Sequence, residues 1–199
     1  ASDEANNGSG KVDEWKRQRL LGVGADIVIA DRPLLTGTAS KPGVDPEQYG
    51  NGLIVLGKVT MRGAEKSPTF VRLTQEPKTG SSTLLLESPV SGWSVDDRIL
   101  LPDSRQFHWG MGAGAVPRFW EDVRIKSVSS DGKTITLDAP VQFVHKGARD
   151  NDGTLRFLPH VSNLSRTVRI RSENPAGVRG HTIFTGRAEV DIEYAEFIG

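Results

Sequence analysis

Apolar and polar residues alternate in short runs along most of this chain, and segments rich in glycine, proline or serine separate the runs. Alternation over about four to eight residues is typical of a half-buried strand, because successive side chains of a strand point to opposite faces. The pattern predicts strands at 27–29, 53–60, 69–74, 83–87, 98–101, 121–129, 133–138, 155–158, 167–171 and 189–193. Only the stretch 11–21 resembles a helix, so we predict an all-β domain with little helix.

One pair of these strands has a clear connection. The sequence Ser130-Asp131-Gly132 separates the runs 121–129 and 133–138. An Asp-Gly pair between two alternating runs favours a tight turn, because glycine adopts positive φ without steric cost. We therefore predict a β-hairpin here.

Two later runs resemble each other. The run 167–171 is followed by 189–193, and alignment of the two places Val168 with Val190 and Arg169 with Asp191. If the two strands stacked in parallel, they would form one apolar ladder and one ladder of opposite charges. Such a repeat is what a β-solenoid needs, because a single turn of the solenoid cannot bury its inner face alone.

Composition narrows the possible functions. Lysine plus arginine equals aspartate plus glutamate at 25 each, so the formal net charge is zero. This balance argues against nucleic acid as the partner. The chain has no cysteine, which excludes disulfides and thiolate chemistry. No apolar run is long enough to span a bilayer.

The two ends of the chain differ in character. Residues 1–24 are polar, with a possible short helix, and we expect the domain to occupy residues 25–199. The strand pattern is still running at Gly199, and a solenoid normally shields its end. We therefore expect the chain to belong to a longer protein, or another protein chain to cover this end.

Clustered carboxylates suggest a first candidate site. Asp96, Asp97 and Asp103 could hold a hard cation such as calcium through oxygen ligands. The alternative is a solvated turn in which Asp97 pairs with a nearby cation or caps backbone amides.

The loop 105–120 is a second candidate. It contains His108, Trp109, Arg118 and Trp120 among several glycines, and it exceeds the usual length of a connection. Aromatic faces beside a flexible loop suit sugar rings, whose C–H groups pack on them. Plain loop packing is the alternative.

Two further segments carry histidine. His145, Arg149, Asp150 and Asp152 could form an acid/base or metal-binding set, or a turn held by polar side chains. His181 follows a tight turn at the start of a strand and could act as a ligand or general base. A buried histidine bonded to a backbone carbonyl is the alternative.

An ordered series of motifs resembles the eight-glycine (G8) domain family. The series covers roughly residues 25–199, and its parts are 52–63, 69–73, 93–98, 135–145, 163–170, 179–184 and 190–197. One position departs from the family's Trp-x-x-Gly-Asp, because Asp96 precedes Asp97 where the family has glycine. By matching motif positions, the resemblance carries over Asp97, His145, Arg166, Arg179 and His181.

The resemblance implies a right-handed parallel β-helix in an extracellular, cell-surface or periplasmic setting. It also implies polysaccharide, such as hyaluronan, as the class of ligand. We expect a carbohydrate-binding module that uses Trp109 and Trp120 together with Arg118, Arg149 and Arg179.

Two other functions stay open. The chain could be a structural part of an extracellular complex, with other protein chains docked at the C-terminal end. It could also cleave polysaccharides, in which case two carboxylates about 5–10 Å apart are needed. Asp97 with Asp150 or Asp152 is then the pair to consider.

Overall fold

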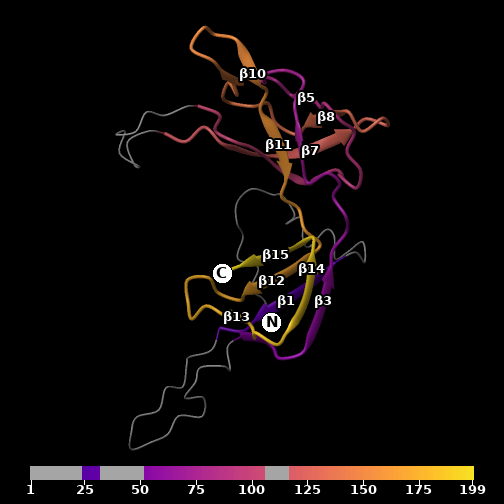
Figure 1. The fold of residues 1–199 in the computed structure, drawn as a ribbon, viewed down its shortest axis with the longest axis vertical. Coiled ribbons are helices and arrows are strands. Elements are labelled where there is room, and N and C mark those ends of the chain that lie inside the picture. The colour runs from indigo at the N-terminus through magenta and orange to yellow at the C-terminus, as the bar shows by residue number, and fades with distance from the viewer. Residues whose placement is uncertain (1–23, 32–51, 106–116) are drawn as a thin grey trace, which may run out of the picture. The chain divides into compact units, whose positions relative to one another are not determined.

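The computed structural model of the chain describes residues 24–31, 52–105 and 117–199. Every regular element within these ranges is a β-strand, which confirms the all-β prediction. The helix expected at 11–21 lies outside the described residues. The chain divides into two compact units (Figure 1). Unit 1 comprises Ala1–Ala64 and Arg166–Gly199, and unit 2 comprises Glu65–Ser165.

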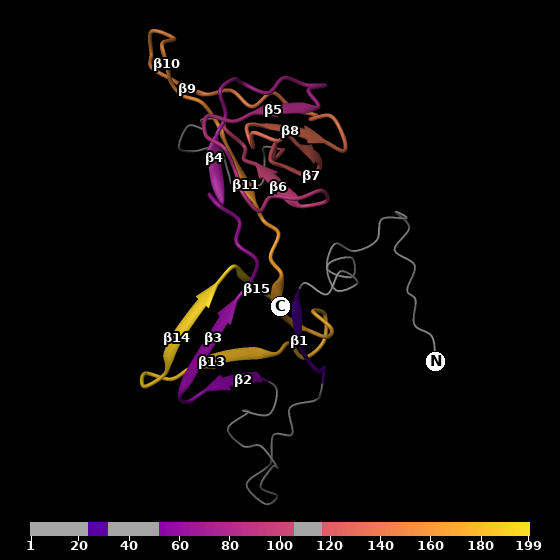
Figure 2. The same ribbon diagram turned by 90° about the vertical axis from the view of Figure 1, so that its right-hand side faces the viewer.

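Unit 1 is built from parallel pairs of strands. Its strands are β1 (Ala25–Ile29), β2 (Gly52–Val55), β3 (Lys58–Arg62), β12 (Val168–Ser172), β13 (His181–Phe184), β14 (Glu189–Glu193) and β15 (Ala195–Ile198). β12 lies between β1 and β15, while β13 pairs with β2 and β14 with β3. In Figure 2 these three sheets form three sides around a common interior. The chain thus passes β1, β2 and β3 once and then repeats the course through β12, β13 and β14.

The register predicted for the two similar runs is wrong. Val168 pairs with Ala25 and Ala195, whereas Val190 pairs with Val59 in a different sheet. The chain turns a corner after each strand, so a strand meets its counterpart in the next turn and not the next similar run. The expected ladders of opposite charge exist with other partners: Arg169 Nε lies 2.5 Å from Glu196, and Arg171 lies 3.0 Å from Asp26.

Close backbone approach explains one glycine of unit 1. A Cβ atom at Gly63 would lie 2.1 Å from the carbonyl oxygen of Tyr194, so a side chain cannot be accommodated there. The amide of Gly63 donates to the carbonyl of Glu193, and the next amide, of Ala64, donates to the Thr167 hydroxyl at 2.6 Å. These contacts hold the end of β3 beside the start of β12. In the sequence, the chain leaves unit 1 just after β3 and returns to it just before β12.

Unit 2 is antiparallel. Its six-stranded sheet has the order β4-β11-β6-β7-β8-β5, and a separate hairpin is formed by β9 and β10. The bounds are β4 (Phe70–Arg72), β5 (Thr83–Leu85), β6 (Arg98–Leu101), β7 (Glu121–Val128), β8 (Thr134–Leu137), β9 (Ala148–Arg149), β10 (Leu155–Phe157) and β11 (His160–Asn163). The predicted hairpin is confirmed as β7 and β8, with Gly132 at φ 69° in the turn.

The sheet of unit 2 curves around one core. A bridge between Leu73 and Leu86 connects the continuations of its two outer strands, β4 and β5. Alternate residues of each strand face the interior, as the period of a strand requires. The core comprises Val71, Leu73, Leu84, Leu86, Val90, Trp93, Ile99, Leu101, Val123, Ile125, Ile135, Leu137, Val141 and Val161.

Candidate functional site

Two loops of unit 2 border a cavity of about 700 Å³. One side contributes Arg105 and Phe119, from the two described ends of the loop 105–120. The other side contributes Val144, Lys146, Arg149, Asp150 and Asn151, and Thr79 lines it as well. We call this hollow the loop cavity. It brings together residues of two segments that the sequence singled out separately.

An aromatic stack carries a cation at one wall of the loop cavity. The rings of Phe119 and Phe143 are parallel within 3° and their centroids are 4.2 Å apart. The guanidinium carbon of Arg105 lies 3.5 Å from the centre of the Phe119 ring. Both faces of Phe119 are therefore covered, and this ring is not available to stack on a sugar. The charged group of this stack is the Arg105 guanidinium, which also donates to Asp103 and to the Pro117 carbonyl.

Asp103 holds that stack in place. Its carboxylate accepts hydrogen bonds from the backbone amide, Nε and a terminal nitrogen of Arg105, at 3.1, 2.9 and 2.7 Å. It also accepts one from the amide of Phe119 at 3.0 Å. The hydrogen bond from Arg105 is the main reason that the pKa of Asp103 lies well below its usual range. Asp103 therefore joins the two ends of the loop, and its oxygens are occupied by donors of the protein.

The remaining charges make the loop cavity cationic. Arg149 pairs with Glu76, which also accepts the amide of Gly147 at 2.7 Å, and the Arg149 hydrogen bond lowers the pKa of Glu76. Lys146 is exposed and makes no hydrogen bond or ion pair with any described residue. The lining residues thus include three cations, Arg105, Lys146 and Arg149, and one carboxylate, Asp150. Asp103 and Glu76, which do not line the cavity, pair with the two arginines, and Arg156 pairs with Asp150.

His145 is a structural anchor behind this lining. Its Nδ1 lies 2.9 Å from the carbonyl oxygen of Pro102, and its Nε2 lies 2.9 Å from Glu121 Oε1. Both ring nitrogens of His145 therefore lie at hydrogen-bond distance from groups of the protein. Glu121 also accepts the amides of Gln142 and Phe143. The pair is buried, so it positions the segment before Lys146 and does not face a ligand.

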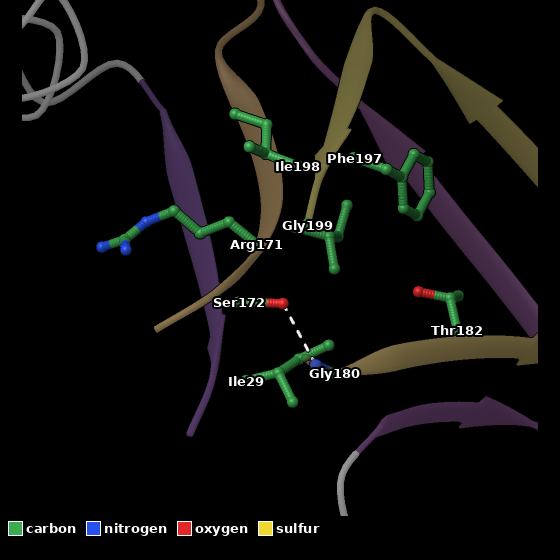
Figure 3. A pocket seen from close by; sticks show the side chains of 9 residues that line it. Ile29, Arg171, Ser172, Gly180, Thr182, Phe197, Ile198 and Gly199 are labelled. Carbon is green, nitrogen blue, oxygen red and sulfur yellow. Dashed lines mark hydrogen bonds between the residues drawn. The ribbon is translucent and has the colours of Figure 1, made fainter. Parts of the chain in front are cut away.

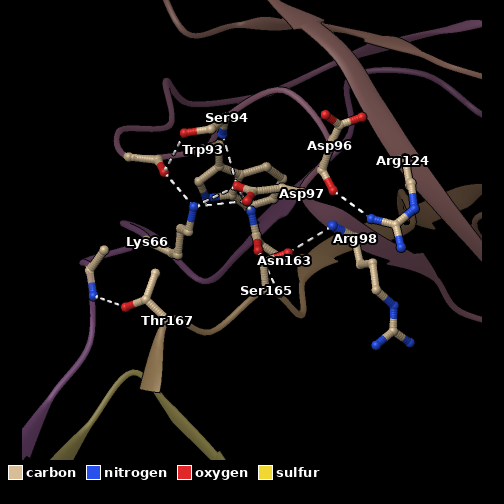
Figure 4. A network of polar contacts seen from close by, with 12 residues as sticks. Lys66, Trp93, Ser94, Asp96, Asp97, Arg98, Arg124, Asn163, Ser165 and Thr167 are labelled. Atoms are coloured by element: carbon tan, nitrogen blue, oxygen red, sulfur yellow. Dashed lines mark hydrogen bonds and ion pairs between the residues drawn. The ribbon is translucent and has the colours of Figure 1, made fainter. Parts of the chain in front are cut away.

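Asp97 lies in a separate buried network (Figure 4). Lys66 Nζ lies 2.9 and 2.7 Å from its two carboxylate oxygens, while Asn163 Nδ2 and the amide of Ser94 each donate at 2.8 Å. The exposed fractions are 1% for Asp97 and 3% for Lys66. This agrees with the alternative in which Asp97 pairs with a cation of the protein. It does not line the loop cavity with Asp150.

Asp96, beside it, has a left-handed backbone with φ 67°. Such a conformation favours glycine, which is the residue that the G8 motif has at this position. Within the described ranges, no three histidine or acidic side chains gather closely enough to hold a metal ion. The calcium site considered for Asp96, Asp97 and Asp103 gains no support from this geometry.

Other candidate residues lie elsewhere. Trp120 and Arg118 are exposed just before β7 but do not line the loop cavity. Asp152 lies in the β9–β10 turn, where its carboxylate accepts a hydrogen bond from the amide of Thr154. Arg179 and His181 belong to unit 1; the ring of His181 packs beside Gly52, and its Nε2 is buried with no hydrogen-bond partner in the described residues. His108 and Trp109 lie outside the described residues.

Lys146 and Thr79 line the loop cavity but were not candidates from the sequence, and neither was Glu76, which binds Arg149 without lining the cavity. Lys146 lies between the candidates His145 and Arg149, whereas Glu76 and Thr79 come from a segment that carried no motif. The only sequence signal for Lys146 was its position, because it directly follows His145, the last residue of the G8-like motif 135–145. Nothing in the alternation indicates that Glu76 meets Arg149, because the two are 73 residues apart.

A smaller cavity, of about 170 Å³, lies within unit 1 (Figure 3). Its lining is mainly apolar or small and includes Ile29, Ile170 and Phe197. The Ser172 hydroxyl accepts the amide of Gly180 at 3.1 Å. Its one charged residue, Arg171, is engaged by Asp26, so this cavity offers a ligand much less polar chemistry than the loop cavity does.

Comparison with known proteins gives a sequence relative. No model of a known protein family matches the chain. Human fibrocystin-L is 31% identical over 121 residues, a match that covers 59% of this chain and 3% of fibrocystin-L. The chain thus corresponds to a small part of that protein's length.

Solved structures with some similarity are phage tailspikes. The Pseudomonas phage phi297 tailspike gp61 has a TM-score of 0.37 at 15% identity, covering 87% of this chain and 22% of the tailspike. The gp54 tailspike of Acinetobacter baumannii phage AP22, solved in complex with capsular saccharide, has a TM-score of 0.37 at 13% identity, covering 90% and 28%. Within the described part of the chain, no helix is long and apolar enough to cross a membrane.

Proposed function

We propose that this chain is a carbohydrate-binding module, and that its loop cavity binds an anionic unit of an extracellular polysaccharide such as hyaluronan. The observation that carries the proposal is the cationic lining, in which Arg105, Lys146 and Arg149 surround one hollow. Charge-assisted hydrogen bonds from such groups to a carboxylate or sulfate are stronger than those between neutral groups. Thr79 and Asn151 add neutral groups that suit sugar hydroxyls.

The setting is part of the proposal. The parallel pairs of unit 1 support an assignment of this unit as turns of a right-handed parallel β-helix. The similarity to fibrocystin-L supports membership of the G8 family and, with it, an extracellular or cell-surface location. Unit 2, which lies in the sequence between β3 and β12, then carries the binding site.

Binding is favoured over cleavage by the count of carboxylates. A glycosidase of the usual kind needs two acidic side chains at the scissile bond. Among the described residues that line the loop cavity, Asp150 is the one carboxylate, and Arg156 is paired with it. Asp97, the other member of the pair considered from sequence, is enclosed with Lys66. The acid/base role of His145 is likewise disfavoured by its burial.

The test is a binding titration with three polymers: hyaluronan, chondroitin sulfate and neutral dextran. We expect the two acidic polymers to bind and dextran not to bind. Lys146→Glu replaces a cation of the lining, and we expect it to weaken binding about tenfold to a hundredfold, the value of a charge-assisted hydrogen bond. Lys126→Glu makes the same charge change at an exposed position of β7 away from the lining and serves as control.

Two outcomes would contradict the proposal. One is equal affinity of the two lysine variants for the acidic polymers, since net charge alone would then explain binding. The other is a wild-type chain that binds neither acidic polymer. Repeating the titration with calcium and with a chelator checks the metal separately, and we expect no difference because Asp97 and Asp103 already bind groups of the protein.

A further inference from the structure

A second feature of unit 2 lies where the outer face of its six-stranded sheet meets the β9–β10 hairpin. Phe70 on β4 and Phe157 on β10 have exposed fractions of 60% and 59%. Arg72 of β4 and His160 of β11 lie between them. We call these four residues the aromatic strip. Alternation places Phe70, Arg72 and His160 outside, because their sequence neighbours Val71 and Val161 fill the core, and Phe157 comes from the separate β9–β10 hairpin.

Contacts make the strip continuous. The ring centroids of Phe70 and His160 are 5.9 Å apart, with the rings tilted by 57°. His160 is the cross-strand partner of Arg72, whose guanidinium carbon lies 5.8 Å from the centre of the Phe157 ring. Two exposed aromatic rings are therefore joined by two side chains that can donate hydrogen bonds.

The strip adjoins the loop cavity through two connections. The chain after β4 continues from Arg72 to Glu76, which binds Arg149 of the cavity lining. Four residues span at most about 14 Å. The β9–β10 hairpin gives the second connection, because it carries Arg149 on one strand and Phe157 on the other. Figure 2 shows β4 and β11 side by side, with this hairpin beyond them.

We propose that the aromatic strip binds further sugar units of the same polysaccharide whose anionic unit occupies the loop cavity. This extension rests on the proposed function. It concerns the length of polysaccharide that the protein contacts. The two places supply complementary chemistry. The loop cavity offers cations but no free aromatic face, since Phe119 is covered on both sides. The strip offers exposed rings for the C–H faces of sugars, with Arg72 and His160 beside them for hydroxyls or carboxylates.

The experiment compares short and long oligosaccharides. Hyaluronan tetrasaccharide and dodecasaccharide are titrated into the wild-type chain and into the double variant Phe70→Ala/Phe157→Ala. We expect the wild type to bind the longer oligomer more tightly. The double variant should lose about tenfold in affinity for the dodecasaccharide, within the range for removing two aromatic contacts, while its affinity for the tetrasaccharide stays unchanged. The unchanged tetrasaccharide affinity also reports that the variant is folded.

The control is Phe184→Ala, which removes an exposed phenylalanine of unit 1. It should leave both affinities unchanged. If the double variant binds both oligomers as the wild type does, the strip does not contact the polysaccharide and the extension is overturned, while the proposed function stands. An equal loss at both lengths also overturns it. If the wild type binds neither oligomer, the extension is overturned, and the proposed function fails with it when chondroitin sulfate does not bind either.

Discussion

The ion pair between Lys66 and Asp97 leads to the sharpest prediction about unit 2. Both side chains are almost fully enclosed, and Lys66 Nζ also donates to the carbonyl of Gly92 at 2.8 Å. Asn163 and the amide of Ser94 complete the shell around the carboxylate. The pair therefore joins the beginning of unit 2 to its last strand and to the turn before β6.

Removing one partner should be costly. In Lys66→Met the carboxylate keeps two hydrogen bonds but loses its counter-charge in a buried place, and such a loss typically costs about 3–5 kcal/mol. Asp97→Asn leaves the ammonium buried instead, so we expect a similar cost. The double variant Lys66→Met/Asp97→Asn removes both charges. It should be less destabilised than the sum of the single variants by more than about 1 kcal/mol.

The assay is urea unfolding followed by tryptophan fluorescence, because Trp93 is buried beside this network and its indole donates to the Pro68 carbonyl at 3.0 Å. Thermal melting gives a second reading, in which a loss of about 3 kcal/mol lowers the midpoint of a unit of this size by at least about 12 °C. Single variants destabilised by less than about 1 kcal/mol, or effects that simply add, would refute the reasoning. The experiment also bears on catalysis: a loss of turnover in Asp97→Asn would mean little if the same variant unfolds.

Two further predictions concern the neighbouring aspartates. Asp96→Gly should raise the stability of unit 2 by up to about 1 kcal/mol, because glycine adopts the positive φ of this position without strain; a lower melting temperature would show that the side chain contributes more than the strain costs. Asp103 has a lowered pKa in the folded chain, so its carboxylate stabilises the fold above its unfolded pKa of about 3.9 and loses this effect as the pH falls toward the folded pKa. The gap in unfolding free energy between wild type and Asp103→Asn should therefore shrink between about pH 4 and pH 2, and a constant gap would contradict this.

Much of the local structure was readable from sequence. The alternation of apolar and polar residues predicted strands, and the Asp-Gly pair predicted that β7 and β8 pair with each other as a hairpin. A hairpin is predictable because both strands and their turn lie within one short segment. The partner of Val168 was not predictable in the same way. All the strands share a period of two, so alternation cannot tell a neighbour in the next turn from a similar run on another face.

For the candidate site, too, the sequence predicted local features and the tertiary structure decided which residues lie together. The loops at 105–120 and 145–152 stood out through their aromatic, charged and glycine residues, and the sequence could also suggest that Asp97 pairs with a cation. The tertiary structure decided that Arg105 and Arg149 line one cavity, that Lys66 is the partner of Asp97, and that Phe70 and Phe157 belong to one strip. Side-chain chemistry is a property of each residue, whereas proximity between distant residues follows from how the strands pair and pack, which no short stretch of sequence contains.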